Sequence, residues 1–334
     1  MIITESLAKG LKNRFFLEIS DEITQKLKLA SNLERPSKNS ISAWLKYQEK
    51  FKKIFGKSVL IFYSGGSKRR PYFALLGISI DENREFNQWN EKCLTGHMVI
   101  MNYEPSFAED MPALFNVGEH AISRIYERAN VLVGKDLQVD IFSILPEFYY
   151  IPIWSSFWAG IFLMFKSYYS NLNELNQVYP VIPSKSGLLL GQITYQKFAL
   201  LELRTFVDDK NLNFQQEKVK KILLKICNGF ESSPLSFYPL TGALGVDEEV
   251  YQSSIMCYEL LKEYDLISSV IFHRVEDDKL RYKLKEDFKR CLSDHSSTIT
   301  QEFVDLSRKI GIRALQLEIK KESLRSHMPS KRSP

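Results

Sequence analysis

Residues 59–80, VLIFYSGGSKRRPYFALLGISI, predict a β-hairpin and thereby decide the fold class. The apolar runs at 59–63 and 72–80 are rich in the β-branched and aromatic residues that favour strands. Two glycines and a proline between them favour a turn. The connection also carries three adjacent cations, Lys68, Arg69 and Arg70. A loop with this charge can contact the phosphates of a nucleic acid or remain in solvent.

The segments on either side of this hairpin carry further strand and helix patterns. Apolar residues at helical spacing predict helices, and short continuous or alternating apolar runs predict strands. Further strands are predicted at 97–103, 187–194 and 198–207, and helices at 40–55, 117–129 and 213–227. Because the strands do not alternate strictly with the helices, we expect an α+β protein with a mostly antiparallel sheet and packed helices.

Two of these helices begin with a capping-box pattern, in which a small polar residue is followed three positions later by Glu or Gln. Asn116 and Glu119 form the pattern before the helix at 117–129, and Asn213 and Gln216 form it before the helix at 213–227. Both pairs therefore predict where a helix starts.

The C-terminal third has a different pattern from the rest of the chain. A helix is predicted at 247–265, and the runs SSVIFHRV and LRYKL predict two strands joined by an acidic turn. This order is typical of a winged helix, so we expect a mainly helical, winged-helix-like region. The predicted organisation is a helical segment at 1–56, an α+β core at 57–228, a linker rich in Gly, Pro and Ser at 229–246, a winged-like domain at 247–310 and a basic tail at 311–334.

The positive charge of the chain is concentrated at its C-terminal end. The net charge is +5, and residues 308–334 hold eight basic and two acidic residues, so the rest of the chain is nearly neutral. A basic tail can bind phosphates or be a solvated end of the chain.

The four cysteines are widely spaced and form no CxxC pair. They predict free thiols in a reducing compartment, with neither a disulfide framework nor a metal site. The N-terminus has no apolar segment typical of a secretory signal, so a cytoplasmic location is expected. Established cofactor motifs are absent from the sequence, and we expect no cofactor.

Residues 148–165, FYYIPIWSSFWAGIFLMF, contain no charged residue. Their length is near the lower limit for a membrane span, but a proline and two serines weaken that interpretation. A buried core helix is the expected structure. A docking surface for a protein partner and a membrane span are the alternatives.

The predicted helix at 117–129 carries the residues best suited to catalysis. His120, Arg124 and Arg128 are four residues apart, so they stack on one face, and Glu127 lies close to that face. A neutral histidine can take a proton from a ribose 2′-hydroxyl, and arginines one turn apart can hold a phosphate. The face is therefore a candidate site for metal-free RNA cleavage, although a solvated polar helix face would have the same composition.

The segment EHAISRIYER at 119–128 resembles the His-Ala-x-x-Arg-x-x-x-Arg helix of small bacterial toxin domains of the RelE/BrnT type. The resemblance implies a helix packed on a curved antiparallel sheet and a metal-independent RNA-cleaving activity. It assigns His120, Arg124 and Arg128 as the matching positions. It covers about ten residues of a chain that is several times longer than those domains.

Other basic residues can contact nucleic acid. Arg204 and Glu202 share one face of the strand at 198–207, which is either an exposed sheet face or the wall of a site. In the winged-helix interpretation, His273, Arg274, Lys279 and Arg281 can meet phosphates.

Two functions follow from these patterns. The first is a nuclease-like effector of a bacterial toxin or defence system, which cleaves RNA through His120, Arg124, Arg128 and Glu127. The second is a non-catalytic module that binds protein or nucleic acid, RNA rather than DNA, as a subunit of a larger complex. A membrane-associated protein is a third, less favoured interpretation.

Overall fold

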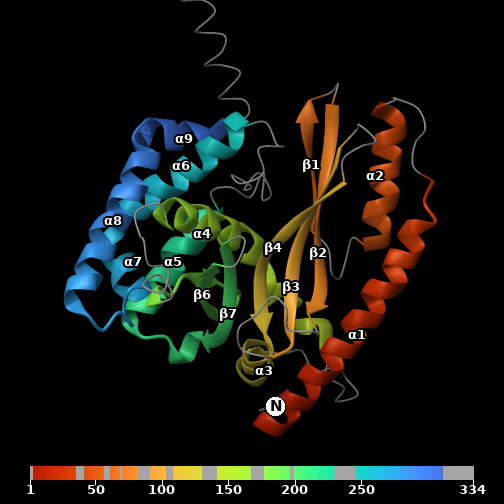
Figure 1. The fold of residues 1–334 in the computed structure, drawn as a ribbon, viewed down its shortest axis with the longest axis horizontal. Helices are drawn as coiled ribbons and strands as arrows, with labels where there is room; N and C mark the ends of the chain where they lie inside the picture. The colour runs from red at the N-terminus through yellow and green to blue at the C-terminus, as the bar shows by residue number, and fades with distance from the viewer. Residues whose placement is uncertain are drawn as a thin grey trace, which may run out of the picture.

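The computed structural model describes residues 3–34, 41–55, 61–67, 70–81, 91–102, 108–129, 141–166, 177–195, 199–228 and 246–310. These residues form an α+β fold in which helices pack around one mixed sheet (Figure 1).

Seven strands form the sheet in the order β1-β2-β3-β4-β7-β6-β5. The strands are β1 Ile61–Ser67, β2 Arg70–Asp81, β3 Cys93–Asn102, β4 Ala108–Gly118, β5 Val181–Pro183, β6 Gly187–Tyr195 and β7 Ala199–Asp208. Every neighbouring pair is antiparallel except β4 and β7, which run parallel. The predicted hairpin is confirmed, since β1 and β2 pair with Ser67 opposite Arg70.

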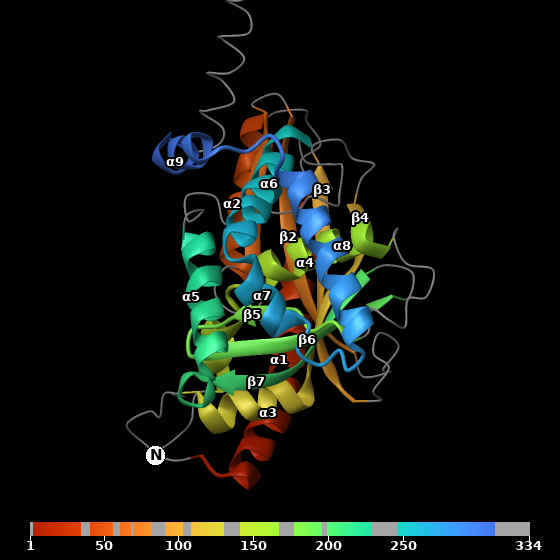
Figure 2. The same cartoon turned by 90° about the vertical axis from the view of Figure 1, so that its left-hand side faces the viewer.

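The helical elements are α1 Glu5–Ser31, α2 Ile41–Phe55, α3 Glu119–Arg128, η1 Ile141–Phe148, α4 Ile151–Lys166, η3 Asp209–Asn211, α5 Phe214–Asn228, α6 Val246–Lys262, α7 Tyr264–Ile271, α8 Asp278–Ser296 and α9 Gln301–Ile310. Helices α1 and α2 lie beside β2, whereas α4 to α9 gather around the β5–β7 end of the sheet (Figure 1). In Figure 2, β6 and β7 run across the view while β2 and β3 stand upright, so the sheet twists strongly along its width.

Helix α4 contains most of the apolar run at 148–165 and lies in the core. It packs against β4 and β7 on one side and against α8 on the other. Trp154, Trp158 and Phe162 are fully buried, and the ring of Phe162 stacks on that of Phe288 with 6.1 Å between the ring centroids. The prediction of a buried helix is therefore confirmed.

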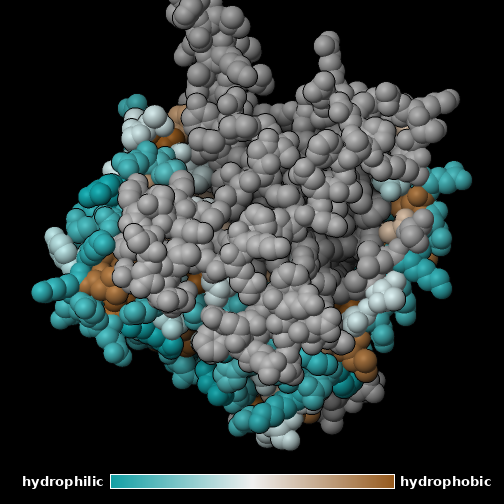
Figure 3. Space-filling model, in the orientation of Figure 1, coloured by the Kyte–Doolittle hydropathy of each residue, from teal (hydrophilic) through white to brown (hydrophobic). Residues whose placement is uncertain are grey.

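Of the described side chains in 148–165, only Tyr149 is exposed. The other described side chains of this run therefore pack inside the protein, and a docking surface for a protein partner stays a prediction. Most of the described surface in Figure 3 is hydrophilic, in line with this burial. None of the helices within the described ranges has the length and apolarity needed to cross a membrane.

The two strands predicted in SSVIFHRV and LRYKL are wrong, because both runs lie in or next to helices. Ile267, Val270 and Ile271 are buried at helical spacing in α7. The carboxylate of Asp277 caps α8 by accepting hydrogen bonds from the backbone N–H groups of Lys279 and Leu280. The acidic residues that suggested a turn between strands are therefore a helix start, and the winged-helix interpretation is not confirmed.

One of the two capping boxes is also wrong. Asn116 lies in β4, where its side chain accepts a hydrogen bond of 2.8 Å from the Thr95 hydroxyl, and α3 begins after Gly118. The second box is confirmed, because the side chains of Asn213 and Gln216 each bond to the backbone N–H of the other.

The predicted domain boundaries stay a prediction, since residues 229–245 of the linker and the tail at 311–334 lie outside the described ranges. Buried apolar residues from α1 to α9 belong to one hydrophobic cluster.

Candidate functional site

Helix α3 places the four predicted catalytic residues on its polar side. Its apolar side, which includes Ile122 and Ile125, is buried. His120 is exposed in the first turn. The guanidinium of Arg124 forms an ion pair of 2.6 Å with Glu127. Arg128 donates a hydrogen bond of 3.3 Å to the backbone carbonyl of a residue in β7.

Helix α1 adds charged side chains beside this face. Lys12 forms an ion pair of 2.5 Å with Glu119. The pKa of Glu5 is lowered, mainly by a hydrogen bond and ion pair with Lys9 and to a lesser extent by the positive charges of Arg124 and His120. The α3 cations are therefore close to carboxylates, which compete with a phosphate for them. The side chain of Arg128 also helps to hold α3 against β7.

The hairpin cations contribute no described side chain. Lys68 and Arg69 lie outside the described residues, and Arg70 begins β2 with a side chain that is not described.

Three of the other predicted nucleic-acid-binding residues, Arg204, Arg274 and Arg281, lie in the region of Tyr179. The guanidinium of Arg274 lies over the Tyr179 ring, 4.6 Å from its centroid. Tyr179 also has a small electrostatic effect on Arg204 and raises its pKa. Arg281 donates a hydrogen bond of 3.0 Å to the backbone carbonyl of Val275, next to Arg274 in sequence. We call this group, with His273, the Tyr179 corner.

Backbone features hold the Tyr179 corner in place. The N–H of Tyr179 donates a hydrogen bond of 3.0 Å to the carbonyl of Ile271, at the end of α7. The strand register shifts where Leu190 faces Thr205 and Gly191 faces Leu203, so Arg204 is the extra residue of a β-bulge. Bulges change the direction of a side chain relative to the regular pleat.

His273 adds an imidazole to the corner. Its side chain is exposed, and its ring centroid is 6.0 Å from that of Tyr179, with the rings inclined at 61°. Its Nδ1 atom lies 2.7 Å from the carbonyl oxygen of Val270. A carbonyl oxygen can only accept a hydrogen bond, so Nδ1 carries a proton.

Arg204 is half-buried, and burial lowers its pKa, while the negative charges of Glu91 and Glu202 partly oppose this shift. The carboxylate of Glu91 is 3.7 Å from the guanidinium. Glu202 is only 2% exposed, so the sheet face it shares is not an exposed face. The burial of Glu202 fits the alternative interpretation, in which this sheet face forms the wall of a site.

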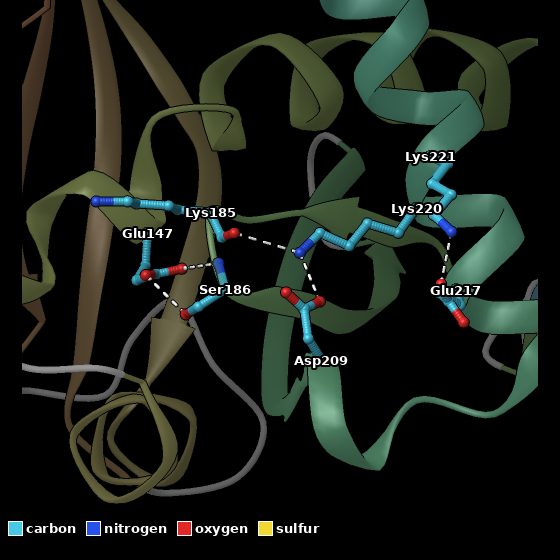
Figure 4. A network of polar contacts seen from close by, with 7 residues as sticks. All are labelled: Glu147, Lys185, Ser186, Asp209, Glu217, Lys220 and Lys221. Atoms are coloured by element: carbon cyan, nitrogen blue, oxygen red, sulfur yellow. Dashed lines mark hydrogen bonds and ion pairs between the residues drawn. The ribbon is translucent and has the colours of Figure 1, made fainter.

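A second polar network fixes the turn between β5 and β6 (Figure 4). The buried carboxylate of Glu147 accepts hydrogen bonds from the N–H and the hydroxyl of Ser186, at 2.9 and 2.7 Å. From the other side, the buried ammonium of Lys220 pairs with Asp209 at 2.6 Å and bonds to the carbonyl of Lys185 at 3.3 Å. These contacts tie the turn to η1 on one side and to α5 on the other, so the role of the network is to hold the turn.

Within the described ranges, no three His, Cys, Asp or Glu side chains are grouped as a metal site would require. All four cysteines are free and buried. Burial raises the pKa of Cys227 to about 12 and, together with the charge of Asp294, that of Cys291 to about 11, so these two thiols are poor nucleophiles.

Comparison with family models, with curated proteins and with solved structures finds no match to this chain.

The sequence identified the three arginines of the Tyr179 corner but not their proximity. Tyr179 was not a candidate, because a single tyrosine before a short strand has no distinguishing local pattern. It lies 25 positions before Arg204 and 95 before Arg274 in the chain.

Proposed function

We propose that this protein is an RNA-binding module and that the Tyr179 corner is its contact surface. The observation that supports the proposal is the position of Arg274 over the Tyr179 ring. Arg204 of β7 acts on the same tyrosine electrostatically, and Arg281 of α8 bonds to the backbone next to Arg274. Three cations from separate elements of a nearly neutral body favour an anionic partner.

The chemistry of the corner suits phosphates. A guanidinium can give two parallel hydrogen bonds to a phosphate, and stacking on an aromatic ring leaves its N–H edge available. Arg274 is exposed, and among the described residues no carboxylate lies within ion-pair distance of it. Arg281 is partly neutralised by Asp278, with which it forms an ion pair. We therefore expect Arg274 to make the strongest phosphate contact.

Fluorescence anisotropy with a labelled single-stranded RNA tests the proposal. Arg274→Gln should weaken binding about tenfold, since one charge-assisted hydrogen bond contributes about 1.5–3 kcal/mol. It should also reduce the slope of log K against log salt concentration by about 0.7, the value for one phosphate contact on a single strand.

Arg290→Gln is the matched control, because Arg290 is an exposed cation on α8 that pairs with Asp287 at 3.7 Å. Equal losses in both variants would mean that only overall charge matters. Failure of the wild-type protein to bind RNA at low salt would refute the proposal.

RNA cleavage through His120, with a role in a toxin or defence system, stays a prediction. The exposure of His120 is compatible with it, whereas the Arg124–Glu127 ion pair weakens the phosphate clamp that it requires. Induced expression of wild type and His120→Ala in bacteria, followed by growth curves and an RNA gel, distinguishes the two outcomes. Equal growth and intact RNA in both strains would end this hypothesis.

A further inference from the structure

We propose that the Tyr179 corner also cleaves RNA without a metal ion and that the Nε2 atom of His273 is the general base. The inference rests on the proposed function, since the RNA must first bind at this corner. It assigns the reaction to a histidine other than His120.

The hydrogen bond to Val270 prepares His273 for this role. Because Nδ1 donates its proton to the carbonyl oxygen at 2.7 Å, the neutral ring has its lone pair on Nε2. The bond also fixes the ring relative to the end of α7, as a base that acts on a bound substrate requires.

The neighbours of His273 supply the charge that cleavage needs. The attack of a ribose oxygen on a phosphodiester increases the negative charge on the phosphate oxygens. Arg274 is the next residue in the chain and is exposed, and Arg204, which pairs with Glu91 at 3.7 Å, interacts electrostatically with the same tyrosine. Fixed cations that face this developing charge lower the barrier.

Helix α3 offers the same residue types in a less suitable state. His120 has two arginines on its own helix, but one is paired with Glu127 and the other bonds to a backbone carbonyl of β7. At the Tyr179 corner, Arg204 and Arg281 are also paired, with Glu91 and Asp278, but Arg274 lies over an aromatic ring that does not compete with a phosphate for the guanidinium. The corner is therefore the better candidate for the reaction.

The reaction is a transesterification in which atoms and charge balance. His273 Nε2 takes the proton of the 2′-hydroxyl, and the 2′-oxygen forms a bond to the adjacent phosphorus. The bond between phosphorus and the 5′-oxygen breaks, and the leaving oxygen takes a proton from water. The products are a 2′,3′-cyclic phosphate end and a 5′-hydroxyl end, and the imidazolium returns its proton to solvent.

The test uses the full-length protein, a labelled single-stranded RNA, excess EDTA and mass spectrometry of the product ends. Wild type should release cyclic phosphate ends, and His273→Ala should slow cleavage about 10²- to 10⁴-fold, the usual contribution of a general base. RNA affinity, measured in parallel, should change less than threefold. The 2′-deoxy oligonucleotide should bind without being cut.

His295→Ala is the matched control, because the Nδ1 atom of His295 also contacts a backbone carbonyl on its own helix, that of Cys291 at 2.8 Å. It should cleave at the wild-type rate. His273→Asn is the second variant, since the Asn amide can still donate to Val270. It should fold normally and be as slow as His273→Ala.

The outcomes separate the two proposals. Binding without cleavage by wild type would overturn this inference and leave RNA binding intact, whereas no binding would remove both. Undiminished cleavage by His273→Ala, or cleavage lost only in His120→Ala, would also overturn it.

Discussion

Removing the Glu147 carboxylate should destabilise the protein by about 3 kcal/mol. Glu147 is 5% exposed and accepts two hydrogen bonds from Ser186. A hydrogen bond to a charged group contributes about 1.5–3 kcal/mol, so Glu147→Ala loses two of them. We expect the lower end of the sum, because a water molecule can enter the space that the side chain leaves.

Urea unfolding followed by circular dichroism measures this effect. With an m-value of about 3 kcal/mol/M, the midpoint should fall by about 1 M. The urea midpoint of Glu147→Gln should lie between those of Glu147→Ala and wild type, since the amide keeps one acceptor oxygen. Glu217→Ala is the control, because Glu217 pairs with Lys221 on the surface of α5 (Figure 4). Loss of this exposed ion pair should leave the midpoint unchanged. Equal midpoints for Glu147→Ala and Glu217→Ala would refute the inference that the buried carboxylate holds the turn.

Three further changes test the packing. Gly10→Ala should stabilise α1 by about 1 kcal/mol, since its Cβ meets no atom within 4 Å, whereas Gly187→Ala should destabilise the sheet, because its Cβ would lie 2.1 Å from a β7 carbonyl oxygen. Differential scanning calorimetry should give melting temperatures that move in opposite directions. Phe288→Ala should cost about 3–5 kcal/mol in urea unfolding, while Tyr282→Ala, 68% exposed on the same helix, should cost little. The free energy of unfolding should fall between pH 9 and pH 11, because the pKa of the Cys291 thiol is raised to about 11 in the folded state and the thiol therefore ionises first in the unfolded state. A Cys291→Ala variant that lost as much stability over this range would contradict this assignment.

Local patterns predicted the elements whose apolar period was unambiguous. The hairpin at 59–80 and the helix that ends near Cys227 agree with the structure because strand-forming residues and a capping box determine them locally. The run SSVIFHRV failed because a short apolar run fits a buried strand and a helix equally well. Its first four residues, 268–271, are the end of α7, which packs against α5 and α6.

The parallel pairing of β4 with β7 could not be predicted, since about 80 residues separate their paired positions. The same distance limits prediction of the site. Arg124 was recognised because its helix repeats locally, but that locality also supplies Glu127 as a neutralising partner. Arg274 has His273 beside it in the sequence, but only the tertiary fold brings Tyr179 to it. Sequence patterns therefore favoured the α3 face, where the charged residues are regularly spaced, over the Tyr179 corner, where Arg274 has no carboxylate partner among the described residues.

The buried face behind Arg204 explains how a cation can stay fixed at the edge of the Tyr179 corner. Glu202 accepts a hydrogen bond of 3.4 Å from Thr194 and lies opposite Asn116 and Gln192 in the strand register, so polar residues occupy paired positions on β4, β7 and β6, two residues before Arg204. Burial at these positions costs free energy unless the groups are paired, which makes alternative arrangements of the strand unfavourable. Arg204 is therefore held before any ligand arrives, and a phosphate that binds it does not have to order the side chain.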